Sequence, residues 1–267
     1  MIVYQLVNEY KGVSEVLSII LTGSGVRDKK NFFYDIDIDV ILKDNIDINT
    51  RKKILKKFSD SIETINGKYG EKDVFILRNS STEIEVSYYT LDRLKNNLFD
   101  VIDNYKASEG YTTCLWKEVS GAFIAYDKEN TFRNLQNKYR VDYPEKLKLN
   151  IVDKNYYLLR DSKLSYYKQI DNAINSGDLI KASQKIRKFL DSYFDVIFAV
   201  NEIPHPGAKR LIAVIDSKCK KKPRLLTTGV SILQENMYTY DKSILQSIND
   251  MVDDLREFLN EEGIKVS

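Results

Sequence analysis

The chain has 267 residues and a formal net charge of +2, because 41 lysine and arginine residues nearly balance 39 aspartate and glutamate residues. This length is enough for one large domain or two modest ones with a real hydrophobic core. The composition, 43% hydrophobic and 30% charged, is typical of a soluble globular protein. The near-neutral balance gives no overall attraction to nucleic acid or to an anionic membrane, so any anion site must come from a local cluster.

Cysteine and histidine are too few for several classes of site. Cys114 and Cys219 lack metal-ligand spacing, and His205 is the single histidine, so His-rich zinc sites and His-based triads are disfavoured. The N-terminal segment MIVYQLVNEYKG lacks the pattern of a signal peptide. No uncharged apolar run approaches the about 20 residues of a membrane span, and we therefore expect a reduced, cytoplasmic protein.

Hydrophobic periodicity predicts mixed α and β structure over the first 90 residues. The spacing predicts a helix over 2–13, strands over 17–23 and 34–42, a helix over 47–65 and a hairpin over 73–78 and 82–90. Asn49 or Thr50 is the expected cap of the second helix.

The remainder of the chain has helical apolar spacing. Helices are predicted over 91–105, 114–127, 144–176, 178–200 and 241–263. Gly177 marks a tight turn between two helices, and Pro204, Pro206 and Gly207 interrupt the helical pattern. We expect an α+β protein, with a small mixed sheet and flanking helices in a domain over 1–105 and a helical bundle over 106–267.

Three aspartates alternate with apolar residues on the second predicted strand. Asp35, Asp37 and Asp39 share one face of that strand, and the intervening isoleucines share the other. Same-face neighbours lie about 7 Å apart along a strand, so like charges repel there. A divalent cation such as Mg²⁺ would relieve the repulsion, because it binds one or two carboxylates together with phosphates and water. The alternative is an acidic face exposed to solvent.

A glycine-containing turn precedes this strand. Gly23 and Ser24 directly follow a predicted strand, and Arg27 lies three residues beyond them. Backbone N–H groups in such a turn can hold a phosphate, and Arg27 can balance its charge. The alternative is an ordinary turn, since the sequence contains neither a Walker loop nor a dinucleotide-binding fingerprint.

The turn and the strand together form a familiar pattern. Gly23-Ser24, ten intervening residues and then Asp35-Ile36-Asp37-Ile38 resemble the signature of the DNA polymerase β-like nucleotidyltransferase superfamily. Its members carry a third carboxylate on a later strand. The family pattern of Glu-Val, one residue and an aromatic residue selects Glu85 for this position, with Glu83 as the alternative.

The resemblance implies a set of functional residues. Asp35, Asp37 and Glu85 would be catalytic and would hold one or two Mg²⁺ ions, while Gly23 and Ser24 would hold the nucleoside triphosphate. Arg27 would also contact the nucleotide. Tyr34 and Asp28 depart from the residues usual in the family, and Asp39 is an extra acid that we expect beside the ligands or in solvent.

The helical half is similar to that of a bacterial subset that includes aminoglycoside and lincosamide nucleotidyltransferases. The similarity lies in residues 121–130, 143–147 and 194–211. It implies a role for Asn201 and for Lys209, whose ammonium could neutralise a triphosphate. The alternative for Lys209 is a solvated basic residue at the start of a helix.

The predicted activity is Mg²⁺-dependent transfer of a nucleoside monophosphate from a nucleoside triphosphate to an acceptor hydroxyl, with release of pyrophosphate. The resemblance implies a small molecule such as an antibiotic as the acceptor, and the charge balance does not favour nucleic acid. Two alternatives stay open: a non-catalytic, antitoxin-like binding module, and a transferase that acts on tRNA or protein. The sequence determines neither the preferred nucleotide nor the oligomeric state.

Overall fold

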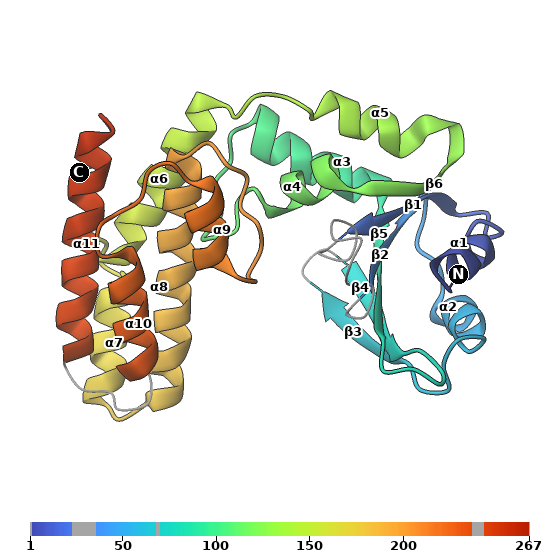
Figure 1. Ribbon diagram of the computed structural model, residues 1–267, viewed down its shortest axis with the longest axis horizontal. Helices are drawn as coiled ribbons and strands as arrows, with labels where there is room; N and C mark the ends of the chain where they lie inside the picture. The colour runs from blue at the N-terminus through green and yellow to red at the C-terminus, as the bar shows by residue number, and fades with distance from the viewer. Residues whose placement is uncertain (1, 23–35, 68–69, 237–242, 267) are drawn as a thin grey trace. The chain divides into compact units, whose positions relative to one another are not determined.

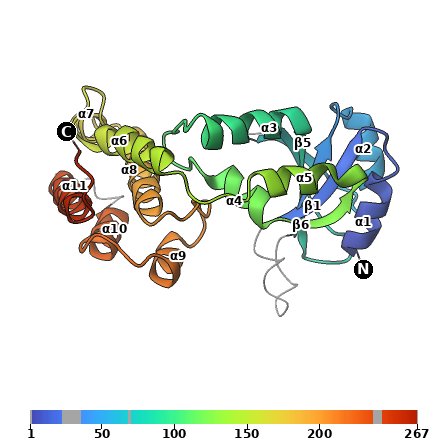
Figure 2. The ribbon, with the colours of Figure 1, turned by 90° about the horizontal axis from the view of Figure 1, so that it is seen from above.

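The computed structural model describes residues 2–22, 36–67, 70–236 and 243–266. These residues form an α+β fold, as the sequence predicted, with one mixed sheet and many helices (Figures 1 and 2). The chain divides into two compact units. The sheet unit comprises Met1–Phe99 and Glu118–Val141, and the helical unit comprises Asp100–Lys117 and Asp142–Ser267.

The described part of the sheet unit contains six strands in the order β3-β4-β5-β2-β1-β6. They are β1 (Val16–Thr22), β2 (Ile36–Leu42), β3 (Glu63–Gly67), β4 (Gly70–Ile76), β5 (Glu83–Thr90) and β6 (Phe123–Asp127). Strands β2 and β5 pair in parallel, and β4 pairs with β5 as an antiparallel hairpin. The strands predicted over 17–23 and 34–42 are therefore confirmed for their described residues, 17–22 and 36–42, and the predicted hairpin is confirmed as well.

Helices α1 (Ile2–Tyr10) and α2 (Ile48–Leu55) cover one face of this sheet. Their apolar side chains, such as Leu6 and Leu55, join Ile38, Val86 and their neighbours in a single core. Helices α3 (Leu91–Leu98) and α5 (Thr131–Lys138) contact strands β5, β1 and β6. A π turn (Phe99–Asp103) extends α3, and a short 3-10 turn (Lys128–Asn130) precedes α5.

The helix predicted over 47–65 is shorter in the structure. Asp47, rather than Asn49 or Thr50, caps α2, because its side chain accepts hydrogen bonds from the backbone N–H groups of both of those residues. The helix ends at Leu55, and β3 follows at Glu63 as the outer neighbour of β4. Pairing with β4 thus overrides the helical spacing of this segment.

The helix predicted over 114–127 is also interrupted. Helix α4 (Cys114–Gly121) ends where β6 begins, and β6 pairs with β1 in antiparallel fashion. This pairing satisfies backbone groups of β1 that would otherwise form an open sheet edge. Residues 118–141 therefore belong to the sheet unit, whereas the sequence placed one boundary between residues 105 and 106.

The helical unit is built around one long helix, α8. Its helices are α6 (Glu145–Leu159), α7 (Tyr166–Asn175), α8 (Leu179–Val200), α9 (Leu211–Lys218), α10 (Leu226–Glu235) and α11 (Ser243–Glu261). Helices α6 and α7 both pack against α8, and α10 packs against α11. The segment predicted as one helix over 144–176 is two helices, and Gly177 turns the chain into α8 with a φ of 70°.

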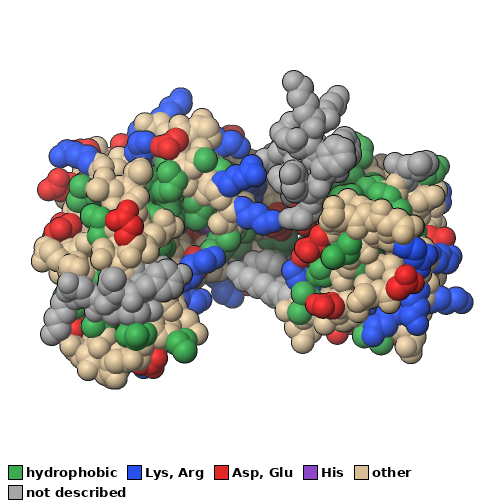
Figure 3. Space-filling model, turned by 60° about the horizontal axis from the view of Figure 1, so that its bottom comes forward, with side chains coloured by type: hydrophobic (Ala, Val, Ile, Leu, Met, Phe, Trp, Pro, Cys, Tyr) green, Lys and Arg blue, Asp and Glu red, His purple; other side chains and the backbone are tan. Residues whose placement is uncertain are grey.

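The surface carries charges of both signs. On the face of each unit drawn in Figure 3, basic and acidic side chains are interspersed with apolar ones. None of the helices within the described residues has both the length and the apolar character that crossing a membrane requires.

Candidate active site

Strands β2 and β5 place two of the predicted acidic residues side by side. Asp37 lies opposite Glu85 in the register of this parallel pair, and neighbouring strands are about 4.8 Å apart. Ile38 and Val86, the next residues on each strand, point the other way into the core. The core therefore fixes which face carries the acids, and the register places Glu85, not Glu83, beside Asp37.

Lys72 of β4 contacts the same carboxylate. Its Nζ lies 2.6 Å from Oε2 of Glu85, and each side chain is about 30% exposed. The hydroxyl of Ser87 donates a longer hydrogen bond, 3.4 Å, to Oε1 of Glu85. Lys72 faces Ser87 in the β4–β5 register, which explains why its side chain reaches along the strand to Glu85. Both oxygens of Glu85 therefore have partners.

Asp39 lies one step further along the acidic face and is buried rather than solvated. Burial raises the pKa of its carboxyl well above the usual value, and the negative charge of Glu118 adds to this effect. Asp37 and Glu85 raise the pKa further, while a hydrogen bond with Thr22 opposes the shift. Asp39 is thus a buried acid beside Asp37 and not the solvated residue that the sequence allowed.

Five further residues were predicted for this site. Asp35, Gly23, Ser24 and Arg27 lie outside the described residues, so their roles stay predictions. Lys209 belongs to the helical unit, and its role also stays a prediction.

Asn201, which the family resemblance singled out, has a clear structural contact. Its side-chain oxygen accepts from the backbone N–H of Lys221 at 3.1 Å, and its amide donates to the carbonyl of Lys221 at 2.8 Å. These two bonds fasten the basic loop before α10 to the end of α8. Asn201 therefore stabilises this unit irrespective of any catalytic role.

His205 is a core residue of the helical unit. It is fully buried, and its backbone N–H donates to Oγ1 of Thr113 at 2.7 Å. The rings of Tyr111 and Phe198 each lie 4.8 Å from the imidazole, measured between ring centres. This packing gives His205 a structural role in the core of the helical unit.

Sequence reasoning missed Lys72 as a member of the site. The hairpin contained the signal, because Lys72 and Val74 are two residues apart and lie on the face of the sheet that also carries Glu85. The neighbouring Asp73 points to the opposite face, where it is fully buried. The sequence alone did not give the register that separates these two charged neighbours.

The carboxylate pair fits a hard divalent cation. Within the described residues there is no group of three or more His, Cys, Asp or Glu side chains placed to hold a metal ion. Asp37 and Glu85 nevertheless supply adjacent oxygen donors on one face, and Mg²⁺ usually takes one or two carboxylates with water and substrate phosphates. Asp35, the third predicted ligand, would come from the residue just before β2.

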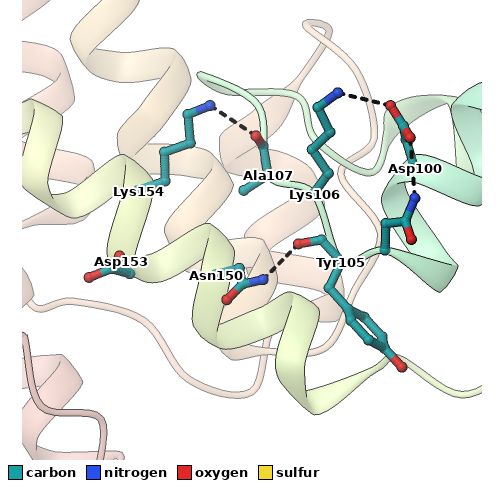
Figure 4. Close-up of a pocket in the computed structure, with 8 residues that line it drawn as sticks. Asp100, Tyr105, Lys106, Ala107, Asn150, Asp153 and Lys154 are labelled. Atoms are coloured by element: carbon teal, nitrogen blue, oxygen red, sulfur yellow. Dashed lines mark hydrogen bonds and ion pairs between the residues drawn. The ribbon is translucent and has the colours of Figure 1, made fainter.

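The helical unit has a groove of its own, shown in Figure 4, with a volume of about 510 Å³. The amide of Asn150 donates to the carbonyl of Tyr105 at 2.8 Å, and Nζ of Lys154 donates to the carbonyl of Ala107 at 3.0 Å. These hydrogen bonds thus fasten the segment before α4 to α6, which gives the polar groups of the groove a structural role.

No family model and no curated protein matches the chain. Solved structures similar to it include a nucleotidyltransferase-like protein from Exiguobacterium sibiricum 255-15, which is 15% identical over 96% of this chain and 72% of that chain, with a TM-score of 0.41. The spectinomycin adenyltransferase AAD(9) from Enterococcus faecialis, solved with ATP and spectinomycin, is 13% identical over 95% of this chain and 99% of that chain, with a TM-score of 0.31.

Proposed function

We propose that this protein is a Mg²⁺-dependent nucleotidyltransferase that moves a nucleoside monophosphate from a nucleoside triphosphate to an acceptor hydroxyl and releases pyrophosphate. The observation that supports this most is the register of β2 and β5, which places Asp37 beside Glu85. Two acids on one face of a sheet repel each other, and a bound cation would offset this repulsion.

Asp35, Asp37 and Glu85 are the proposed cation ligands, with room for one or two Mg²⁺ ions. Bound Mg²⁺ would supply charge neutralisation at the triphosphate and a lowered pKa at the attacking hydroxyl. Glu85 either completes the cation site or accepts the proton of that hydroxyl. Its position beside Asp37 suits both roles.

The nucleotide contacts rest on the sequence pattern. Gly23 and Ser24 would hold the phosphates through backbone N–H groups and a hydroxyl, and Arg27 would balance their charge. Lys209 of the helical unit would stabilise the pyrophosphate leaving group. Positioning and charge neutralisation supply most of the acceleration in phosphoryl-type transfer.

The first acceptors to test are small molecules. The net charge of +2 does not favour a polynucleotide. ATP and spectinomycin, the pair bound by AAD(9), are a sensible first assay, followed by each labelled nucleoside triphosphate against other aminoglycosides, lincosamides, tRNA and protein.

The decisive experiment compares label transfer by the wild type with that by four variants. Asp37→Asn keeps the size of the side chain and removes its charge, so we expect transfer to be abolished. Asp44→Asn makes the same change at an exposed position after β2 and should transfer normally. Glu85→Gln should lose transfer and Glu83→Gln should keep it. Normal transfer by Asp37→Asn would show that the site is wrongly assigned.

A non-catalytic binding module is the competing function. It would bind a nucleoside triphosphate without pyrophosphate release, whatever the acceptor. Calorimetry with nucleotide and Mg²⁺, run beside a pyrophosphate assay, separates the two. Binding without product over the whole panel would favour the module.

A further inference from the structure

The contact between Lys72 and Glu85 raises a question about the proposed cation site. The ammonium lies 2.6 Å from Oε2 of Glu85, and this oxygen belongs to the carboxylate that would bind Mg²⁺. An ammonium and a divalent cation that share one carboxylate oxygen repel each other strongly, because both are positively charged and only a few ångströms apart. Occupation by one therefore opposes occupation by the other.

The environment of Lys72 allows the contact to break. Its side chain and that of Glu85 are about 30% exposed, and ion pairs that solvent reaches are weak. A lysine ammonium also sits on a flexible stem with three rotatable donors. Arg51, in the same unit, forms a different kind of ion pair. Its side chain is only 2% exposed, and it pairs with both Glu71 and Asp73.

Without a cation, Glu85 needs a positive partner for a second reason. It lies in register with Asp37, so two carboxylates occupy neighbouring strands on one face of the sheet and repel each other. The ammonium reduces that repulsion and fixes the Glu85 side chain on the face where a cation would be bound. The hydroxyl of Ser87, 3.4 Å from Oε1, supports the same position.

We propose that Lys72 is a positioning residue that takes the place of the cation at Glu85, and that its ammonium leaves this carboxylate when a divalent cation binds. The inference rests on the proposed function, because it takes Glu85 as a cation ligand. The competing explanation is a permanent ion pair that fastens β4 to β5 and does not respond to metal.

Competition predicts that removal of the ammonium strengthens metal binding. Mn²⁺ binding to the full-length chain, followed by electron paramagnetic resonance, should be about two- to fivefold tighter in Lys72→Met than in the wild type. Lys72→Arg keeps the charge and should not show this gain. Lys57→Met is the matched control, because Lys57 pairs with Glu9 at the same 2.6 Å, and its Mn²⁺ affinity should equal that of the wild type.

A second measurement avoids variants altogether. Acetylation of lysines in the wild type, quantified by mass spectrometry, should increase at Lys72 when Mg²⁺ is added, because a paired ammonium reacts more slowly than a free one. Lys57 is the internal control and should react equally with and without Mg²⁺.

The outcomes separate the two proposals. If the wild type binds no Mn²⁺, the cation site itself is wrong, and both proposals fall. If it binds Mn²⁺, but Lys72→Met binds no more tightly and Mg²⁺ leaves the acetylation of Lys72 unchanged, Lys72 is a permanent structural partner. In that case the nucleotidyltransferase proposal stands and the inference about Lys72 does not.

Discussion

Replacing Arg51 by methionine is expected to destabilise the sheet unit that carries the proposed site. Arg51 on α2 lies under strands β4 and β5, where its Nε is 3.5 Å from Oδ2 of Asp73. Asp73 is fully buried and accepts further hydrogen bonds from Thr64 at 2.7 Å and from Tyr88 at 2.9 Å. The guanidinium also lies 4.6 Å from the centre of the Tyr88 ring.

The magnitude follows from the charge that the variant leaves behind. Arg51→Met removes the cation but keeps Asp73 fully buried, and breaking a buried pair in this way costs about 3–5 kcal/mol. Two hydroxyl donors remain on Asp73, which do not replace a full positive charge. The double variant Arg51→Met/Asp73→Asn removes both charges and keeps a carbonyl oxygen for Thr64 and Tyr88. It should recover more than half of the lost stability.

Urea denaturation followed by circular dichroism measures these differences, and hydrogen exchange assigns them to peptides of the sheet unit. Trp116, the single tryptophan, belongs to the helical unit, so its fluorescence reports the other unit. The reasoning is refuted if Arg51→Met lies within about 1 kcal/mol of the wild type, which is the ordinary value for an exposed pair. It also fails if the double variant is as unstable as the sum of the two single variants.

Three further predictions concern the helical unit. Gly177→Ala should lower the free energy of unfolding by about 1–2 kcal/mol, because a φ of 70° is unfavourable for alanine. Steric contact does not contribute, since no atom lies within 4 Å of the added methyl group. An unchanged midpoint in urea denaturation would contradict this prediction. Phe189→Ala should lower the free energy of unfolding by about 3–5 kcal/mol, because the Phe189 ring is fully buried and stacks on Tyr193. Hydrogen exchange in α8 at the rate of the wild type would contradict this prediction. Burial raises the pKa of the Cys219 thiol to about 11. The rate of its alkylation by iodoacetamide, measured on the peptide, should therefore rise about tenfold per pH unit between about pH 8 and pH 10. A rate that levels off in that range would disprove the shift.

Much of the local structure could be predicted because it depends on short-range periodicity. The alternation in residues 34–42 identified β2, and the pattern of residues 82–90 identified β5. Alternation also predicted that Asp37 shares a face with Asp35 and Asp39, since the side-chain period of a strand is two residues. The same reasoning failed for residues 123–127, which form a strand that pairs with the edge of β1.

The grouping of charged residues was decided by pairing between strands. Nothing within β2 or β5 states that they are neighbours, that they run in parallel, or that Asp37 meets Glu85. The β4–β5 register sends Lys72 to the acidic face and Asp73 to the core, although the two are adjacent in sequence. Register depends on the complete hydrophobic face and on turn geometry, which no single strand contains.

The sequence by itself therefore determined strands β1, β2, β4 and β5, the acidic face and a family resemblance carried by residues 23–38 and Glu85. The tertiary structure decided which charges meet. It buried Asp39, whose pKa is raised chiefly because solvent is excluded, and it gave Glu85 the partner Lys72. The physical reason is that the periodicity of one segment shows which way a side chain points, whereas burial and charge pairing depend on segments that folding brings together.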